Sequence, residues 1–184
     1  LIKRLIPIKV LDYLQYKYGL NKALLGQIII MHSNFHIWIP GAITKAEEIM
    51  TNYPAIYPTI VWRIVLGQGI DDALSYAKKF TEVVARIKKY WKIDDKYAQE
   101  ITIGNGVENA FEIAGEISKM ASNIEKKYPK LGQKYIMFIA SASKSGREIE
   151  NAKKFLKTAE DIKIKYPDIN EGYAKAIIYL YGLK

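Results

Sequence analysis

The sequence contains no cysteine and only two histidines among its 184 residues. The absence of cysteine excludes disulfide bonds, thiolate metal ligands and cysteine nucleophiles. His32 and His36 are four residues apart, so a helix would place them on one face. A zinc site there would need a carboxylate ligand as well, for example from Glu47 or Glu48, and the Glu that follows the first His in metalloprotease motifs is absent. We therefore expect no metal site, no cofactor and no histidine-based catalysis.

Other catalytic patterns are also missing. Gly67-Gln68-Gly69 and Gly104-Asn105-Gly106 lack the third glycine of a dinucleotide-binding loop and the Gly-Lys-Ser/Thr of a P-loop. The acid pairs Asp71-Asp72 and Asp94-Asp95 stand where helices are expected to begin, and a carboxylate there complements the helix dipole. The sequence therefore predicts a protein that is not an enzyme.

No apolar run is long enough to cross a membrane without polar interruption. The most apolar stretch, residues 23–39, is broken by several polar side chains and is followed by Pro40. A membrane span needs about 20 predominantly apolar residues, so we interpret this stretch as one buried helix that Pro40 stops. No segment has the order of a signal peptide. We expect a cytoplasmic protein without a membrane partner.

The composition is that of a basic globular protein. There are 28 Lys plus Arg against 19 Asp plus Glu, a net charge of +9, and 49% of the residues are hydrophobic. Lysine far outnumbers arginine, and isoleucine far outnumbers leucine. Enrichment in Lys and Glu is typical of heat-stable proteins, so the composition favours a thermophilic source.

The sequence repeats itself about every 38 residues. Tyr90, Tyr128 and Tyr166 are each 38 residues apart, and Tyr-Pro-x-Ile/Leu occurs at Tyr53, Tyr57, Tyr128 and Tyr166. Residues 66–74 match residues 103–111 at every position with an identical or similar residue, 37 apart, and a looser third copy covers residues 143–152. Agreement at this many offsets indicates a true internal repeat.

Each repeat predicts a pair of helices. Proline is tolerated in the first turn of a helix, so Tyr-Pro is expected to open a short helix with an apolar stripe. The paired glycines should then end it in a left-handed conformation, and a long helix with recurring alanines should follow. No stretch shows the alternation of a strand with hairpin turns. The predicted fold class is all-α, built as stacked helix-turn-helix hairpins in an α-solenoid.

The repeat resembles the tetratricopeptide type. The resemblance lies in a small residue and turn before an aromatic residue or Ile, an Ala three residues later, and a Pro that opens the next helix. It covers about residues 42–184 and is best in 58–128, although the period is 37–38 and the full family signature is absent. Residues 1–184 would form a single domain, with 1–41 as an N-terminal cap or degenerate repeat around Lys17-Tyr18-Gly19-Leu20. A helical bundle built by duplication is the alternative.

This resemblance implies a non-enzymatic scaffold for protein–protein interaction. Its short helices would line a groove that binds a protein or peptide partner. The residues predicted to contact that partner stand at one position of the repeat: Trp62, Gln99, Met137 and Lys175.

A second reading starts from the lysines that precede each repeat tyrosine. If the hairpins stack, a basic ridge would run along one edge, formed by Lys88, Lys89, Lys126, Lys127, Lys163 and Lys165. Such a ridge attracts phosphate or an acidic surface. A small, basic, helical, Tyr- and Ile-rich chain also resembles coat proteins of filamentous viruses of hot archaea. The alternative function is therefore a nucleic-acid-binding structural protein that assembles with itself in a virion.

Overall fold

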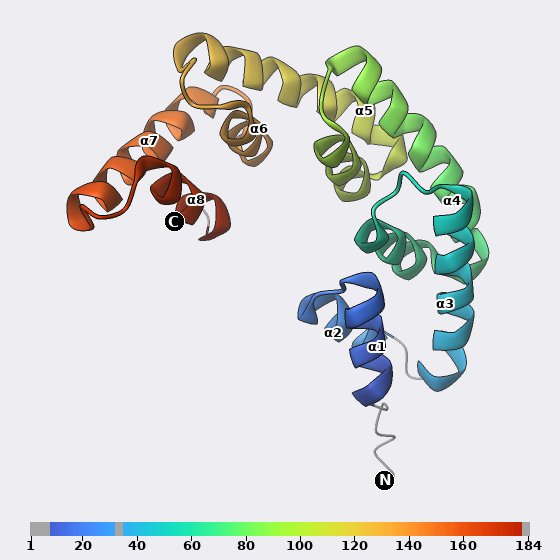
Figure 1. Ribbon diagram of the computed structural model, residues 1–184. Helices are drawn as coiled ribbons and strands as arrows, with labels where there is room; N and C mark the ends of the chain where they lie inside the picture. Colours follow the sequence, from blue (N-terminus) through green and yellow to red (C-terminus); the bar gives the residue numbers. More distant parts are fainter. Residues whose placement is uncertain (1–7, 32–34, 182–184) are drawn as a thin grey trace. The chain divides into compact units, whose positions relative to one another are not determined.

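The structure, a computed structural model, describes residues 8–31 and 35–181 (Figure 1). Within these ranges all regular structure is helical, which confirms the predicted all-α class. The helices are α1 (Ile8–Tyr18), α2 (Lys22–Met31), α3 (Phe35–Asn52), α4 (Pro58–Trp91), α5 (Asp95–Lys127), α6 (Gln133–Ala142), α7 (Glu148–Lys165) and α8 (Glu171–Tyr181). In the part of the chain that the structure describes, none of these helices combines the length and the apolar character that a membrane span requires.

The helices form two compact units whose boundary lies within α5. One unit ends at Phe111 and the other begins at Glu112. Each unit has its own core of fully buried side chains: Leu14, Ile49, Trp62, Ile64, Phe80 and Ile87 in the first, and Ile124, Ile136 and Phe155 in the second. Burial of one such side chain contributes about 1.5–3 kcal/mol, so these stripes supply most of the free energy that holds the helices together.

The two longest helices are each divided by one glycine. Gly69 has φ 81° and ψ 169°, and Gly106 has φ 78° and ψ 155°. This backbone conformation is essentially restricted to glycine. It separates a short helix A (58–68 and 95–105) from a long helix B (70–91 and 107–127). The predicted break is confirmed at the second glycine of each pair, whereas Gly67 and Gly104 lie inside helix A.

The Tyr-Pro pairs end helices more often than they open them. The N–H of Tyr53, Tyr128 and Tyr166 donates to the carbonyl four residues earlier, at 2.7–2.9 Å, and so closes the preceding helix. Each tyrosine carbonyl then accepts a hydrogen bond at 3.0 Å from the N–H three residues later, which makes a β-turn. Proline suits the second position of such a turn because its φ is already near −65°. We call this four-residue segment the Tyr-Pro turn.

The prediction that Tyr-Pro opens helix A is therefore correct only for Tyr57-Pro58, where proline stands in the first turn of α4. Helix A instead starts five residues after each repeat tyrosine, and the repeat tyrosines are Tyr53, Tyr90, Tyr128 and Tyr166. The helices that follow them begin at Pro58, Asp95, Gln133 and Glu171. The spacing of these starts reproduces the 37–38-residue period seen in the sequence.

The first helices share part of this turn chemistry. Asn21 Oδ1 accepts a hydrogen bond from the N–H of Leu24 at the start of α2, just as Asp94 caps α5 and Asn170 caps α8. The predicted helix over 23–39 includes residues 32–34, which lie outside the described residues; α2 ends at Met31 before them and α3 begins at Phe35 after them. Pro40 lies inside α3 rather than before it. Pro40 is the sixth residue of α3, so it does not stop the helix as predicted, although proline there removes one hydrogen bond and crowds the carbonyl four residues earlier.

Gly69→Ala is expected to lower the free energy of unfolding by about 1–3 kcal/mol, because alanine is strained at this φ and ψ. Gly67→Ala is the matched control: an added Cβ there meets no atom within 4 Å, and alanine is the better helix former. Urea unfolding followed by circular dichroism measures both variants. Equal effects of the two substitutions would contradict the assigned break.

Candidate functional site

The four residues predicted to line a groove are buried or half-buried, and two of them, Trp62 and Gln99, lie at contacts between hairpins. They lie nine residues after the repeat tyrosine, in helix A. Trp62, Gln99 and Met137 are 0%, 2% and 4% exposed, and the side chain of Lys175 is 11% exposed. Burial gives no support to a groove that presents these side chains to a partner, and the contacts that three of them make within the chain explain why.

Gln99 binds the Tyr-Pro turn at the start of the preceding hairpin. Its Nε2 donates to the carbonyl of Ala55 at 2.8 Å, and its Oε1 accepts from the N–H of Tyr57 at 3.1 Å. Nε2 also donates to Asp95 Oδ2 at 2.7 Å, and Asp95 Oδ1 is 2.6 Å from Lys88 Nζ. One buried amide therefore connects the turn of one hairpin to helix A of the next, and Lys88 connects helix B to the same point.

Trp62 makes the corresponding contact one hairpin earlier. Its ring packs against the ring of Tyr18, with 5.5 Å between centroids, at the end of α1. The hydroxyl of Tyr18 donates to Glu47 Oε1 at 2.9 Å, and Lys17 Nζ lies 2.6 Å from the same oxygen. Burial and the hydrogen bond to Glu47 raise the pKa of Tyr18 to about 12. The ammonium of Lys17, with the hydroxyl of Tyr18, lowers the pKa of Glu47.

Lys175 occupies this position in α8, beside the Tyr-Pro turn of residues 128–131. Its Nζ lies 2.6 Å from Glu171 Oε1. Two adjoining cavities open here, of about 540 and 360 Å³, and both are lined by Leu156, Glu171 and Lys175. Where Gln99 closes the first junction with hydrogen bonds, the junction around Lys175 keeps an open space.

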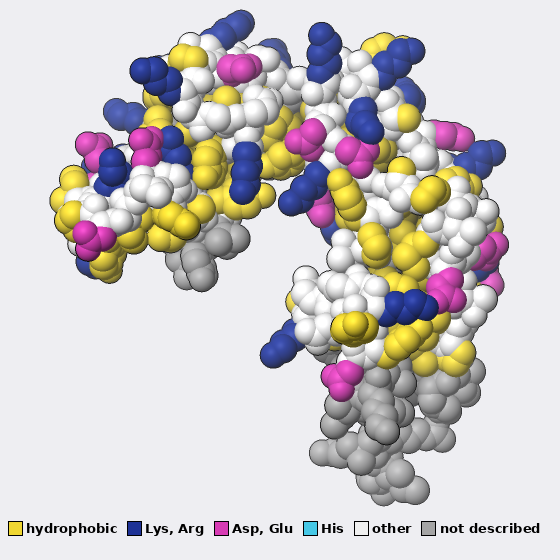
Figure 2. Space-filling model, in the orientation of Figure 1, with side chains coloured by type: hydrophobic (Ala, Val, Ile, Leu, Met, Phe, Trp, Pro, Cys, Tyr) yellow, Lys and Arg dark blue, Asp and Glu magenta, His cyan; other side chains and the backbone are white. Residues whose placement is uncertain are grey.

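The six lysines of the predicted basic ridge are all exposed and all stand in the last turn of a helix: Lys88 and Lys89 in α4, Lys126 and Lys127 in α5, and Lys163 and Lys165 in α7. Cations there complement the helix dipole. Lys89 Nζ is 5.8 Å from the ring centre of Tyr90, and Lys165 Nζ is 5.5 Å from that of Tyr166. On the face shown in Figure 2, basic side chains stand among acidic ones. The alignment of the six lysines along one edge stays a prediction.

The buried carboxylate of Glu148 is a feature that the sequence reasoning missed. Glu148 is 6% exposed in the first turn of α7, and Asn123 Nδ2 of α5 donates to its Oε1 at 3.0 Å. That hydrogen bond, with backbone N–H groups, lowers its pKa. An ionised, hydrogen-bonded carboxylate at a helix start joins two helices, so Glu148 has a structural role. The only sequence signal for it is an acid shortly after Gly146.

The predicted histidine pair cannot be judged from the structure, because His32 and the side chain of His36 lie outside the described residues. Among the residues that are described, no group of three His, Asp or Glu side chains is arranged to hold a metal ion.

Gln99→Met is expected to lower the free energy of unfolding by about 1–2 kcal/mol, because Ala55 and Tyr57 lose their hydrogen-bond partner. Methionine is the residue that the repeat itself places at this position in Met137. Gln68→Met is the matched control, since Gln68 is exposed and a surface change has an effect within about 0.5 kcal/mol. Denaturant unfolding measures both, and a Gln99→Met variant as stable as the control would show that the amide does not hold the junction.

The comparisons with known proteins add no relative: no family model, no curated protein and no solved structure matches the chain.

Proposed function

We propose that this chain is a non-enzymatic scaffold of stacked helical hairpins, of the tetratricopeptide-like kind, that binds other proteins. The observation that carries the proposal is the repeated junction: helix A of one hairpin contacts the turn at the start of the hairpin before it. Trp62 and Gln99 make this contact in the first unit, and Lys175 stands at the same position in the second.

Contacts between successive A helices support the stack in each unit. In the first unit, Arg63 and Glu100 form an ion pair at 2.9 Å, and these residues hold the same position of the repeat, 37 residues apart. In the second unit, the ring of Tyr179 in α8 packs against Tyr135 and Phe138 in α6, with centroids 6.3 and 5.0 Å apart. Hairpins that contact only their neighbours form an extended array, and such arrays present large surfaces to partners.

A binding role fits the chemistry of the titratable groups better than catalysis does. Glu47 and Glu148 have lowered pKa values because hydrogen bonds from neighbouring helices stabilise their charge. Catalytic acids and bases are instead tuned toward the working pH. Among the described residues, these two carboxylates thus join helices to one another.

Nucleic-acid binding is the second candidate, and the exposed ridge lysines favour it. Tyr90 and Tyr166 are 63% and 50% exposed directly beside Lys89 and Lys165. A lysine next to an exposed ring combines attraction for phosphate with a surface on which a base can stack.

Small-angle X-ray scattering tests the stacked architecture. A compact bundle of this length has a radius of gyration of about 16 Å. Hairpins in a row, each adding about 10 Å, are expected to give a value several ångströms larger. A measured radius near the compact value at low protein concentration would support the duplicated bundle instead.

Selection from a random-peptide phage library tests the protein-binding role. We expect the immobilised native chain to enrich peptides that do not bind the same chain after unfolding in urea. In a parallel experiment, the binding of fluorescently labelled duplex DNA to the chain is measured at several salt concentrations. If no peptide is enriched and the chain binds duplex DNA with an affinity that falls steeply with salt, the second candidate replaces the scaffold.

A further inference from the structure

We propose that the junction between α7 and α8 is a binding site for an acidic segment of a partner protein, in which a carboxylate side chain is followed by an aliphatic one. The inference rests on the proposed protein-binding function and names the chemistry of the partner. The repeat provides an internal standard for the argument, because the positions five and nine residues after the repeat tyrosine are also present at a closed junction in the first unit.

At the closed junction the charges balance. Lys88, Asp95 and Gln99 form one connected chain, with a cation, an anion and a neutral amide. The amide hydrogen-bonds directly to the Tyr-Pro turn. The buried residue of this set is therefore uncharged and fully engaged within the chain, so the junction has no need of a ligand.

At the α7–α8 junction the positions of Asp95 and Gln99 hold Glu171 and Lys175. Lys163 stands one residue before the position of Lys88, and these three side chains are two cations and one anion. Lys175 replaces the neutral Gln99, and its side chain is 11% exposed. Glu171 is the carboxylate bonded to it, and the pKa of Glu171 is lowered first by Lys175 and further by the charge of Lys163. The two adjoining cavities together are lined by four lysines, Lys127, Lys130, Lys163 and Lys175, against the two carboxylates of Glu160 and Glu171. A mostly buried cation that shares its counterion favours the approach of another anion.

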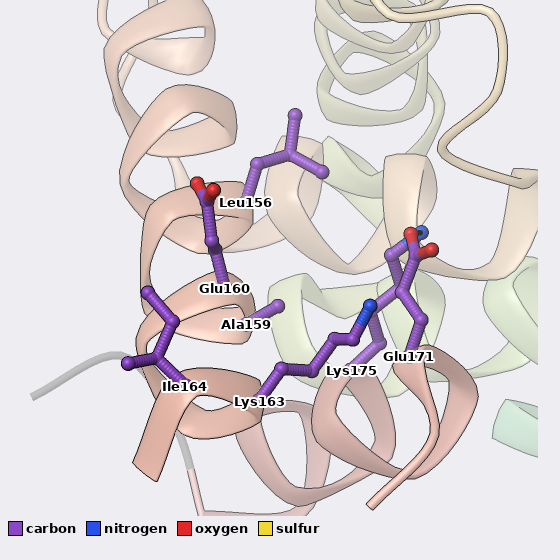
Figure 3. A pocket seen from close by; sticks show the side chains of 7 residues that line it. All are labelled: Leu156, Ala159, Glu160, Lys163, Ile164, Glu171 and Lys175. Carbon is purple, nitrogen blue, oxygen red and sulfur yellow. Dashed lines mark ion pairs between the residues drawn. The ribbon is translucent and has the colours of Figure 1, made fainter. Parts of the chain in front are cut away.

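The space for such an anion is present and has an apolar lining. Figure 3 shows Lys163 reaching from α7 toward α8, where Lys175 and Glu171 lie next to each other. The larger cavity is about 540 Å³ and includes Leu156 and Ala159 in its lining. The adjoining cavity of about 360 Å³ includes Leu131 and Lys130 of the Tyr-Pro turn, and Lys127 before it. Cavities of this size accept ligands or a few side chains.

The lining favours a peptide over a nucleic acid. Phosphate backbones are bound mainly by exposed lysines and arginines in a field of one sign, whereas Glu160 and Glu171 also line this pocket and would repel a polyanion. A single carboxylate can approach the two lysines, and Leu156 can contact the aliphatic side chain beside it. An amphipathic acidic peptide satisfies both parts of the site.

Fluorescence anisotropy tests the site with a short fluorescein-labelled peptide that carries a single Glu-Leu pair. A peptide of equal length that carries Gln-Leu in its place is the neutral probe. Lys175→Gln, which reproduces the first junction, is expected to weaken binding of the Glu-Leu probe about tenfold. Lys157→Gln removes one charge from an exposed position of α7 outside the pocket, and should change binding by no more than about twofold.

Glu171→Gln is expected to change the affinity for the Glu-Leu probe in the opposite direction. Glu171 competes with the probe for Lys175, so its neutralisation should tighten binding of the Glu-Leu probe. This residue is 61% exposed, and circular dichroism checks that each variant is folded. Equal binding of the two probes, equal loss with Lys175→Gln and Lys157→Gln, or weaker binding with Glu171→Gln would overturn the site. The site would also be overturned if Lys175→Gln weakened the binding of duplex DNA but not the binding of the peptide. Peptides enriched by the library whose binding survives Lys175→Gln would overturn this site and leave the scaffold function intact.

Discussion

The packing of helix A against the turn at the start of the preceding hairpin, made by Trp62 and Gln99 in the first unit, is the contact on which that unit depends. A helical hairpin exposes an apolar stripe that it cannot bury alone, so its neighbour must cover that stripe. Trp62 and Gln99 show that two unrelated side chains can make this contact, one by ring packing on Tyr18 and one by hydrogen bonds to Ala55 and Tyr57. Both residues stand nine positions after a repeat tyrosine, and the chemistry at the contact differs.

The side chain nine residues after the repeat tyrosine differs between junctions, and this difference can produce a binding site. The backbone of the repeat is set by the turn and by the glycine break, so the side chain nine residues after the tyrosine can change without loss of the hairpin. A neutral, hydrogen-bonded residue such as Gln99 closes the junction. A lysine at the same place pairs with Glu171 and leaves open space around it. A binding site would then arise where a structural contact is relaxed.

Much of this architecture could be read from the residues, and the errors have identifiable causes. The positive φ at Gly69 and Gly106 was predictable because each residue recurs at the repeat period and only glycine adopts that conformation readily. The role of the prolines was harder to predict, because their fixed φ suits both the first turn of a helix and the second position of a β-turn. Hydrogen bonds to the turn decide between the two. Trp62, Gln99 and Met137 were placed in a groove because helical spacing shows that residues share a face, and does not show what covers that face.

The sequence by itself determined the helical class, the 37–38-residue period, the residues at which helices break, and the lysines at helix ends. These follow from local backbone preferences and from spacing, both of which act within a few turns of chain. Only the tertiary structure decided that the residue nine positions after the repeat tyrosine is buried, that Glu148 meets Asn123 of another helix, and that a cavity opens beside Lys175. Those features depend on contacts between residues far apart in the chain, where burial and charge balance are set by whichever side chain the neighbouring hairpin supplies.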